Sequence, residues 1–239
     1  MSPQPVSRHT VRAVIFDMDG VIIDSGQVIE RAWSQAAERR GVFITAEQAR
    51  HSIHGRTGAQ TVKALFPTRS AEEHLAIWRE VDSIEEVAAY GAIAGVQTFL
   101  RSLHDSGVAM ALVTSGWTRK VDNVLSALGL SDIFPLRITR DQVERGKPHP
   151  EPYLTACREL GIRPDRALVF EDSHSGVASA VSAGTVCVGV GDPALRALGA
   201  VDVVPDFTSL TVTADLATTE LGGLAGSIQV LKPEAGLDV

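Results

Sequence analysis

The 239-residue sequence has few cysteines, an aromatic content of only 5% and no long apolar run. Its two cysteines, Cys157 and Cys187, form no CxxC pair or metal-ligating spacing, so we expect reduced thiols in a hydrophobic core. The first ten residues, MSPQPVSRHT, lack the apolar stretch of a signal peptide, and no later run reaches the ~18 apolar residues of a membrane span. These absences predict a cytoplasmic protein without a membrane partner.

An excess of positive charge is also missing. The 22 lysines and arginines are outnumbered by 29 aspartates and glutamates, and the net charge is −7. Nucleic-acid binding would lose its main electrostatic contribution, so no nucleic-acid partner is expected. Hydrophobic residues make up 44% and charged residues 21% of the chain, which is the balance of a globular protein with a substantial core.

Short apolar runs alternate with helical patterns along the chain. The runs are 11–16 (VRAVIF), 108–113 (VAMALV), 167–170 (ALVF) and 185–190 (TVCVGV). Between them, apolar residues at helical spacing, such as Val96, Phe99 and Leu103, precede a glycine that ends the helix, as Gly107 does. This alternation predicts an α/β fold with a Rossmann-like core built on a parallel sheet.

One interval, residues 24–91, contains helical patterns but no convincing strand. Thr45 with Gln48, and Ser70 with Glu73, have the spacing of capping boxes at helix N-termini. We therefore interpret this interval as a small α-helical cap inserted into the sheet-containing part.

The predicted domains follow from this insertion. Residues 1–23 and 92–210 form the α/β core, and residues 24–91 form the cap. Trp33 and Trp78 are expected in the hydrophobic core of the cap, since aromatic residues on an apolar helical stripe usually pack inward. The tail, 211–239, contains a weak strand-like patch at 228–231 and is left without defined structure or chemistry.

Acidic residues directly follow two of the predicted buried strands, as Asp17-Met18-Asp19-Gly20 and as Glu171-Asp172. The carboxyl ends of parallel strands meet at one edge of the sheet, where ligands bind. Carboxylates about 4 Å apart repel by about 4 kcal/mol at an effective dielectric constant of ~20, so such a cluster requires a proton or a cation. Oxygen ligands favour Mg²⁺. The alternative is a pair of solvated turns, because Asp and Gly are common turn residues.

Two further segments supply groups that suit a phosphate. Thr114 and Ser115 end the predicted strand at Val113 and offer a hydroxyl and backbone amides to phosphoryl oxygens. Lys147, in the GKPHP loop, would neutralise developing negative charge if it lay near the carboxylates. Each segment alone is also compatible with an ordinary turn or a solvated loop.

Taken in this order, the motifs DxDG, strand-Thr-Ser, Lys-Pro and a late acidic pair resemble the haloacid dehalogenase superfamily, over roughly residues 11–190. The segments GVIIDS, GKPHPEPYL and VFEDSHSGVASAVSAG look like the branch that contains β-phosphoglucomutase and the sugar and glycerol phosphatases. The resemblance implies a Mg²⁺-dependent phosphatase that acts on a small sugar or polyol phosphate through an aspartyl-phosphate.

The resemblance also implies roles for individual residues. Asp17 would be the nucleophile and Asp19 the general acid and base. Thr114 and the amide of Ser115 would bind phosphate, and Lys147 would stabilise it. Mg²⁺ would be held by the carboxylate of Asp17, the backbone carbonyl of Asp19 and Asp172, with Glu171 as a direct or water-mediated ligand.

The cap bears on the choice within the branch. In β-phosphoglucomutase a histidine stands ten residues after the second aspartate of DxDG, whereas that position here is Ile29, which favours a phosphatase over a mutase. The cap segment 54–57, HGRT, is similar to the sugar and glycerol phosphatases. Arg56 is the predicted substrate contact, with a solvated surface arginine as the alternative.

Other functions remain open at this stage. A phosphoglucomutase-type transferase is the alternative within the branch, and a catalytically silent binding protein is the non-enzyme alternative. A receiver-type signalling domain is disfavoured, because receivers place the acidic pair first and the phosphoacceptor later. The expected partner is a small phosphorylated metabolite, and the chain is expected to be a monomer, with an oligomer left open.

Overall fold

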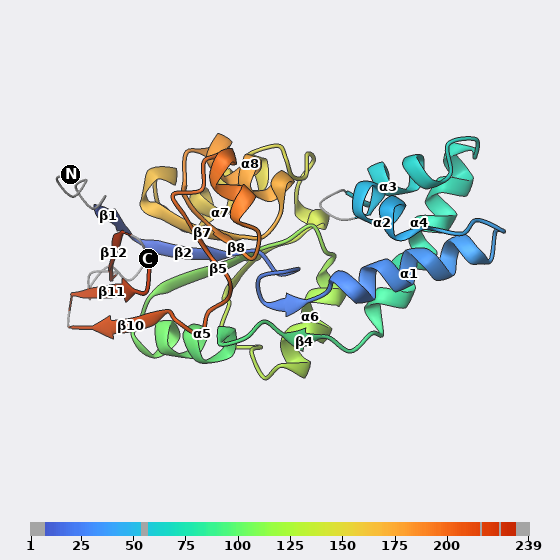
Figure 1. The fold of residues 1–239 in the computed structure, drawn as a ribbon. Helices are drawn as coiled ribbons and strands as arrows, with labels where there is room; N and C mark the ends of the chain where they lie inside the picture. The colour runs from blue at the N-terminus through green and yellow to red at the C-terminus, as the bar shows by residue number, and fades with distance from the viewer. Residues whose placement is uncertain (1–7, 54–56, 216, 225, 233–239) are drawn as a thin grey trace.

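The computed structural model describes residues 8–53, 57–215, 217–224 and 226–232. A sheet-containing core and a group of helices lie side by side, and the first and last described strands lie at the end of the core far from those helices (Figure 1). The core comes from both ends of the described chain, and the helical cap comes from the segment between strands β3 (Ile23–Asp24) and β4 (Gly91–Ala92). These two strands pair antiparallel where the chain leaves and re-enters the core.

The core is built on a six-stranded sheet in which every neighbouring pair is parallel. In spatial order its strands are β6 (Leu136–Ile138), β5 (Ala109–Val113), β2 (Ala13–Phe16), β7 (Ala167–Glu171), β8 (Val186–Val190) and β9 (Asp202–Val204). β2 lies near the centre and is buried at every position, as expected for a strand covered on both faces.

Helices cover both faces of this sheet. On one face α5 (Val96–Asp105) and α6 (Thr118–Ala127) pack against the even-numbered side chains of β2, among them Phe16. On the other face α7 (Glu151–Glu159) and α8 (His174–Ala183) pack against Ile15. Three 3₁₀ helices complete the core: η1 (Arg140–Gln142), η2 (Pro164–Arg166) and η3 (Pro193–Leu198). The predicted α/β fold with a parallel sheet and helical cap is confirmed.

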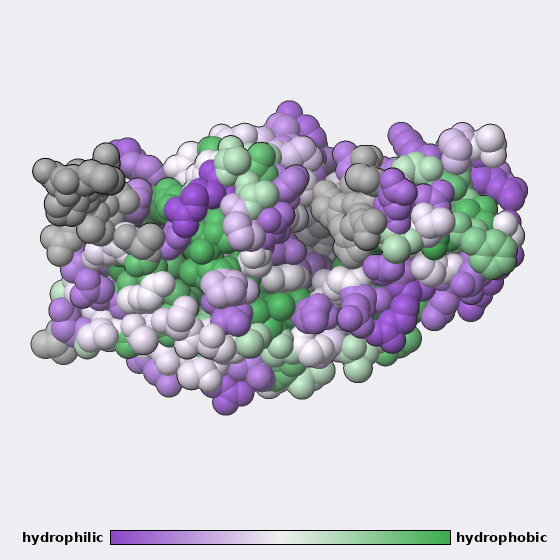
Figure 2. Space-filling model, viewed as in Figure 1, coloured by the Kyte–Doolittle hydropathy of each residue, from purple (hydrophilic) through white to green (hydrophobic). Residues whose placement is uncertain are grey.

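The cap consists of α1 (Gly26–Glu38), α2 (Ala46–Ser52), α3 (Gly58–Leu65) and α4 (Ala71–Glu86). Its buried apolar residues form a hydrophobic cluster separate from those of the core. The two expected capping boxes are present at Thr45 and Ser70, and a third begins at Thr57. Hydrophilic side chains are frequent over the cap, whereas hydrophobic residues gather on part of the core (Figure 2).

A second sheet joins the two ends of the described chain. Strand β1 (Arg8–Val11) pairs in parallel with β12 (Ser227–Leu231), and β11 (Thr218–Gly222) and β10 (Thr211–Ala214) continue the sheet antiparallel. Leu221, Ile228 and Val230 are buried within the same hydrophobic cluster as α5 and α6. The strand-like patch predicted at 228–231 is therefore part of β12.

Some details of the sequence interpretation are wrong. The run 11–16 is not one strand, because the backbone bends at Arg12, whose amide donates to the carbonyl of Arg166, and β1 and β2 enter different sheets. Trp33 is in the cap core as expected, but Trp78 is half-buried and lines the cleft beside the cap. Both cysteines are buried free thiols, as predicted. Among the described residues, no helix combines the length and hydropathy that a membrane span requires.

Candidate active site

Three carboxylates gather at the carboxyl edge of the parallel sheet. The register of β2 places Phe16 beside Phe170 of β7, so Asp17 continues alongside Glu171. Oxygen atoms of Asp17, Glu171 and Asp172 all lie within 4.8 Å of one another. Residues separated by more than 150 positions are brought together because two buried parallel strands end at the same level.

Lys147 lies in the middle of this cluster and is buried. Its Nζ donates to Oδ1 of Asp17 at 2.7 Å, to Oε1 of Glu171 at 2.6 Å and to the carbonyl oxygen of Val113 at 3.1 Å. All three ammonium protons can therefore be satisfied inside the protein. The loop that carries Lys147 delivers a fixed positive charge to the predicted nucleophile.

Glu171 is fully buried, and protein donors occupy both of its carboxylate oxygens. The hydroxyl of Tyr153 on α7 donates to Oε1 at 2.7 Å, beside Lys147. The backbone amides of Asp172 and Ser173 donate to Oε2 at 3.1 and 3.3 Å. This arrangement suits a carboxylate that anchors Lys147 better than one that is free to ligate a metal directly.

Two glycines make room for these carboxylates. Gly20 has φ +76°, and a Cβ built there would stand 1.9 Å from Oδ2 of Asp172. A Cβ on Gly176, in the first turn of α8, would stand 1.8 Å from Oε1 of Glu171. Any side chain at either position would displace an acidic group, so the glycines of the DMDG and SHSG segments have a steric role.

The electrostatics of the cluster reflect crowded buried acids. The pKa of Asp17 is raised from its usual 3.8 to about 7, mainly by burial; Lys147 opposes the rise, and Glu171 and Asp19 add to it. Burial and the neighbouring carboxylates of Glu171 and Asp17 raise the pKa of Asp172 well above its usual value. Burial alone would lower the pKa of Lys147, but Asp17 and Glu171 outweigh it and keep the ammonium charged.

This donor set fits a divalent cation with oxygen ligands. One ammonium does not neutralise three converging carboxylates, and the repulsion among these acids adds to burial in raising the pKa values of Asp17 and Asp172. Mg²⁺ typically binds one or two carboxylates and keeps several waters. Asp17 and Asp172 could provide these carboxylates.

Asp19 has a separate partner. Its Oδ1 accepts a hydrogen bond of 2.9 Å from Nζ of Lys120 on α6, and the same Nζ donates at 2.9 Å to Oε2 of Glu85 on α4. Lys120 and Glu85 are both buried. The predicted acid–base residue is thus connected to a cap helix through one buried lysine.

Sequence reasoning missed Lys120, Glu85 and Tyr153. A usable signal existed for Lys120, because it stands four residues before the buried Val124 and hence on the inward face of its helix. A lysine on an apolar stripe usually has a buried acidic partner. Nothing in the sequence identifies Glu85 as that partner.

The remaining predicted residues lie around a cleft of about 1080 Å³ between core and cap. Thr114 is buried at the end of β5, and its hydroxyl oxygen accepts from the amide of Gly116 at 3.0 Å. Ser115 is exposed beside it, and both line the cleft. Arg56, the predicted substrate contact, lies outside the described residues.

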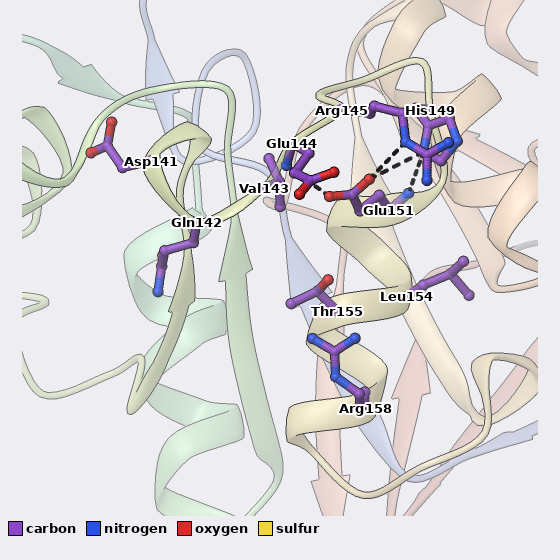
Figure 3. A pocket seen from close by; sticks show the side chains of 10 residues that line it. All are labelled: Asp141, Gln142, Val143, Glu144, Arg145, His149, Glu151, Leu154, Thr155 and Arg158. Carbon is purple, nitrogen blue, oxygen red and sulfur yellow. Dashed lines mark hydrogen bonds and ion pairs between the residues drawn. The ribbon is translucent and has the colours of Figure 1, made fainter.

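A second hollow, beside α7, contains none of the predicted catalytic residues (Figure 3). The carboxylate of Glu151 lies at its centre and accepts from the amide of Glu144 and from Nε of Arg145, at 2.7 and 3.0 Å. The same residue donates its own amide to Nδ1 of His149. These contacts join the Lys147 loop to α7. The polar residues around the hollow therefore have a structural role.

Comparison with known proteins identifies the family of this chain. The family model of haloacid dehalogenase-like hydrolases matches residues 14–190. The chain is 33% identical to validoxylamine A 7'-phosphate phosphatase of Streptomyces hygroscopicus subsp. limoneus, over 75% of this chain and 85% of that protein. It is 31% identical to hexitol phosphatase A of Escherichia coli K12, over 84% and 94%.

A solved structure agrees in fold. β-Phosphoglucomutase from Clostridium difficile superposes with a TM-score of 0.73 at 25% identity, over 84% of this chain and 93% of that one. The matched family segment runs from β2 to β8 and thus includes Asp17, Lys147 and Asp172. The chain therefore belongs to the haloacid dehalogenase-like hydrolases.

Proposed function

We propose that this protein is a Mg²⁺-dependent phosphatase that hydrolyses phosphate monoesters of sugars or polyols through a phosphoryl group carried on Asp17. Family membership and relatives named as phosphatases make it a phosphoric monoester hydrolase. The finer proposal is supported above all by the convergence of Asp17, Asp172 and Lys147 at the end of the sheet. The cytoplasmic location stays a prediction.

Each residue has a part in a two-step reaction. A carboxylate oxygen of Asp17 attacks phosphorus, the bond from phosphorus to the leaving oxygen breaks, and Asp19 gives that oxygen a proton. Water then attacks the phosphorus carried on Asp17 and loses a proton to Asp19, and the bond from phosphorus to the Asp17 oxygen breaks. Inorganic phosphate is released, Asp17 is again a free carboxylate and Asp19 is again protonated. Lys120 holds the carboxylate of Asp19 in place for both proton transfers.

Charge stabilisation accompanies both steps. Lys147 faces Asp17, where negative charge gathers on the transferred phosphoryl group, and Thr114 and Ser115 offer donors at the neighbouring strand end. Mg²⁺ would be held by the carboxylates of Asp17 and Asp172 and by the backbone carbonyl of Asp19. Glu171 would interact with the ion through a water molecule. When bound, Mg²⁺ would neutralise the carboxylates and the phosphoryl oxygens.

The test is phosphate release from a panel of sugar and polyol phosphates with MgCl₂. We expect turnover by the wild type and a loss of at least about 1,000-fold in Asp17→Asn, because the nucleophile is removed. Asp165→Asn, at η2 beside the amino end of β7, is the matched control and should retain activity. Equal turnover in Asp17→Asn would refute the proposal, and absence of turnover on every ester would favour a silent binding protein.

Phosphoryl transfer is the second candidate, favoured by the fold shared with a β-phosphoglucomutase. Ile29, which lines the cleft, stands where the mutases have a histidine, so we expect hydrolysis to prevail. β-Glucose 1-phosphate separates the two functions. Free phosphate should accumulate faster than glucose 6-phosphate, and the reverse order would identify a mutase.

A further inference from the structure

The cleft between core and cap holds cations that are already paired with acids. Among the described residues that line it, the cations are Lys120, Arg140 and Lys147. Lys147 is bonded to Asp17 and Glu171, and Lys120 to Asp19 and Glu85. The transferred phosphate can use Lys147, which faces Asp17, whereas Lys120 is held by Asp19 and Glu85 and Arg140 by Asp82.

Arg140 is the cation most open to a ligand, because 30% of its side chain is exposed. Asp82 on the cap helix α4 occupies its guanidinium: Nη1 donates to Oδ1 at 3.3 Å, and Nη2 donates to Oδ2. The guanidinium carbon also lies 4.6 Å from the ring centroid of Trp117 and 5.3 Å from that of Trp78. The planar group is thus bonded at its edge and covered by two rings.

The two Nη groups of Arg140 cannot turn toward an anion without leaving Asp82. That exchange would break a charge-assisted pair that joins α4 to the core, so a substrate carboxylate that took over these two groups would have to displace Asp82. Breaking one partner away from a half-buried ion pair also leaves a charge without its counterion. Asp82 therefore acts as an internal competitor for anionic groups.

Among the residues that the structure describes, the other charged ones that line the cleft are acidic. Asp24, Asp141, Glu144 and Asp192 line it together with Asp82 and Glu85. Asp141 is held by the amide and hydroxyl of Thr118, both at 3.0 Å, so its carboxylate points along a fixed direction. A negative group on the substrate, beyond the phosphate that reacts, would meet repulsion from these acids.

A polyhydroxylated group suits this lining. Carboxylate oxygens accept hydrogen bonds from hydroxyls, and the ring faces of Trp33 and Trp78 provide apolar surface against C–H groups. The volume of about 1080 Å³ exceeds what a three-carbon ester needs and lies at the upper end of ordinary ligand pockets.

Resting on the proposed phosphatase function, we infer that the cleft selects phosphate monoesters whose leaving group is a polyol without negative charge. Esters whose leaving group carries a carboxylate or a second phosphate are rejected, and the Asp82–Arg140 pair is the specificity determinant. Phosphoglycolate and bisphosphates are thereby excluded as good substrates.

The experiment compares esters that differ only in one terminal group. Sorbitol 6-phosphate and 6-phosphogluconate have the same chain length, with CH₂OH replaced by a carboxylate, and glycerol 3-phosphate and 3-phosphoglycerate form a second such pair. With Mg²⁺ and the full chain, kcat/KM should be at least about tenfold higher for the uncharged member of each pair. That factor is the effect of about 1.4 kcal/mol in transition-state binding.

Two variants test the assigned cause. Asp82→Asn keeps the size of the side chain but releases Arg140 from its counterion, so kcat/KM for 6-phosphogluconate should rise and the preference should narrow several-fold. Glu144→Gln removes one negative charge from the same lining, but Glu144 holds none of the cleft cations named above, so this variant should narrow the preference much less than Asp82→Asn does. A narrowing in Glu144→Gln equal to that in Asp82→Asn would overturn the role of the pair.

The remaining outcomes separate this inference from the proposed function. Equal or better hydrolysis of the carboxylate esters by the wild type would overturn the inference while leaving a phosphatase. Hydrolysis of p-nitrophenyl phosphate but of neither polyol phosphate would overturn it as well. If no ester, p-nitrophenyl phosphate included, released phosphate, the proposed function itself would fail.

Discussion

At the scale of single residues, the acidic cluster depends on atoms that approach too closely for a side chain to stand between them. Gly20 and Gly176 each face a carboxylate oxygen at a distance that no Cβ could occupy. The first of them belongs to the same short motif as Asp17 and Asp19. The motif thus specifies two acids and also the space into which Asp172 fits.

This leads to a prediction for Gly20→Ala. The new Cβ would displace the carboxylate of Asp172 and disturb the proposed Mg²⁺ site, and a misplacement of ~1 Å costs about 100-fold in activity. Gly107→Ala is a matched control, since Gly107 has a similar φ of +71° but no atom within 4 Å of its Cβ position. Both variants should lose about 1–2 kcal/mol of stability to the left-handed backbone, but only Gly20→Ala should lose phosphate release. Near-normal turnover in Gly20→Ala would contradict the assigned position of Asp172.

At the scale of elements, α4 and α6 form the joint between cap and core. Lys120 on α6 reaches Glu85 on α4 and Asp19 after β2, so one buried ammonium connects three segments. On the same joint Glu86 accepts from Nε1 of Trp117 at 3.0 Å. Burial raises the pKa of Glu85, with Lys120 opposing the shift, so the acid depends on its partner to remain ionised.

The joint predicts that replacement of Lys120 and replacement of its neighbour Arg119, both on α6, lower the free energy of unfolding by different amounts. Lys120→Met leaves two acids without their counterion and should cost about 3–5 kcal/mol of unfolding free energy. Adding Glu85→Gln should recover part of this loss. Arg119→Met, which breaks an exposed pair with Glu86, should cost under about 1 kcal/mol. Urea unfolding measures all of these values, and an equal cost at both positions would refute the buried joint.

At the scale of the whole molecule, the unbalanced acids at the sheet edge affect the pH dependence of stability. The pKa of Asp17 is raised from 3.8 to about 7 in the folded protein, so the folded state binds more protons than the unfolded state between these values. The free energy of unfolding of the metal-free protein therefore falls as pH rises through this window. The raised pKa of Asp172 acts in the same direction.

Removal of the metal should reveal this effect. In EDTA, the raised pKa values of Asp17 and Asp172 should lower Tm at pH 8 relative to pH 5, on top of whatever the other titrating groups contribute. Added Mg²⁺ should raise Tm more at pH 8 than at pH 5, because protonated carboxyls bind Mg²⁺ poorly. Asp172→Asn should show a smaller gain from Mg²⁺ at pH 8 than the wild type. An equal gain at both pH values in the wild type would show that these carboxyls do not bind the ion.

Much of the fold and several of the site residues follow from local pattern. The buried strands around Phe16 and Phe170 are continuous apolar runs. The acids that follow these runs therefore lie at strand ends, regardless of how the rest of the chain packs. Thr45 and Ser70 begin helices through contacts with residues only three positions away. The strands β6 and β9 escaped prediction because each has three residues, too short to form a pattern.

The sequence by itself determined the order of motifs, the α/β alternation and the placement of acids directly after buried strands, because these are local features of the chain that apolar runs, helical periodicity and capping residues encode. Only the tertiary structure decided which charges are paired. Lys120 and Asp19 are separated by 101 positions, and Arg140 and Asp82 by 58. Such pairs arise where elements far apart in the sequence pack together, as the cap helix α4 does against the core at Arg140, and no local pattern records these contacts.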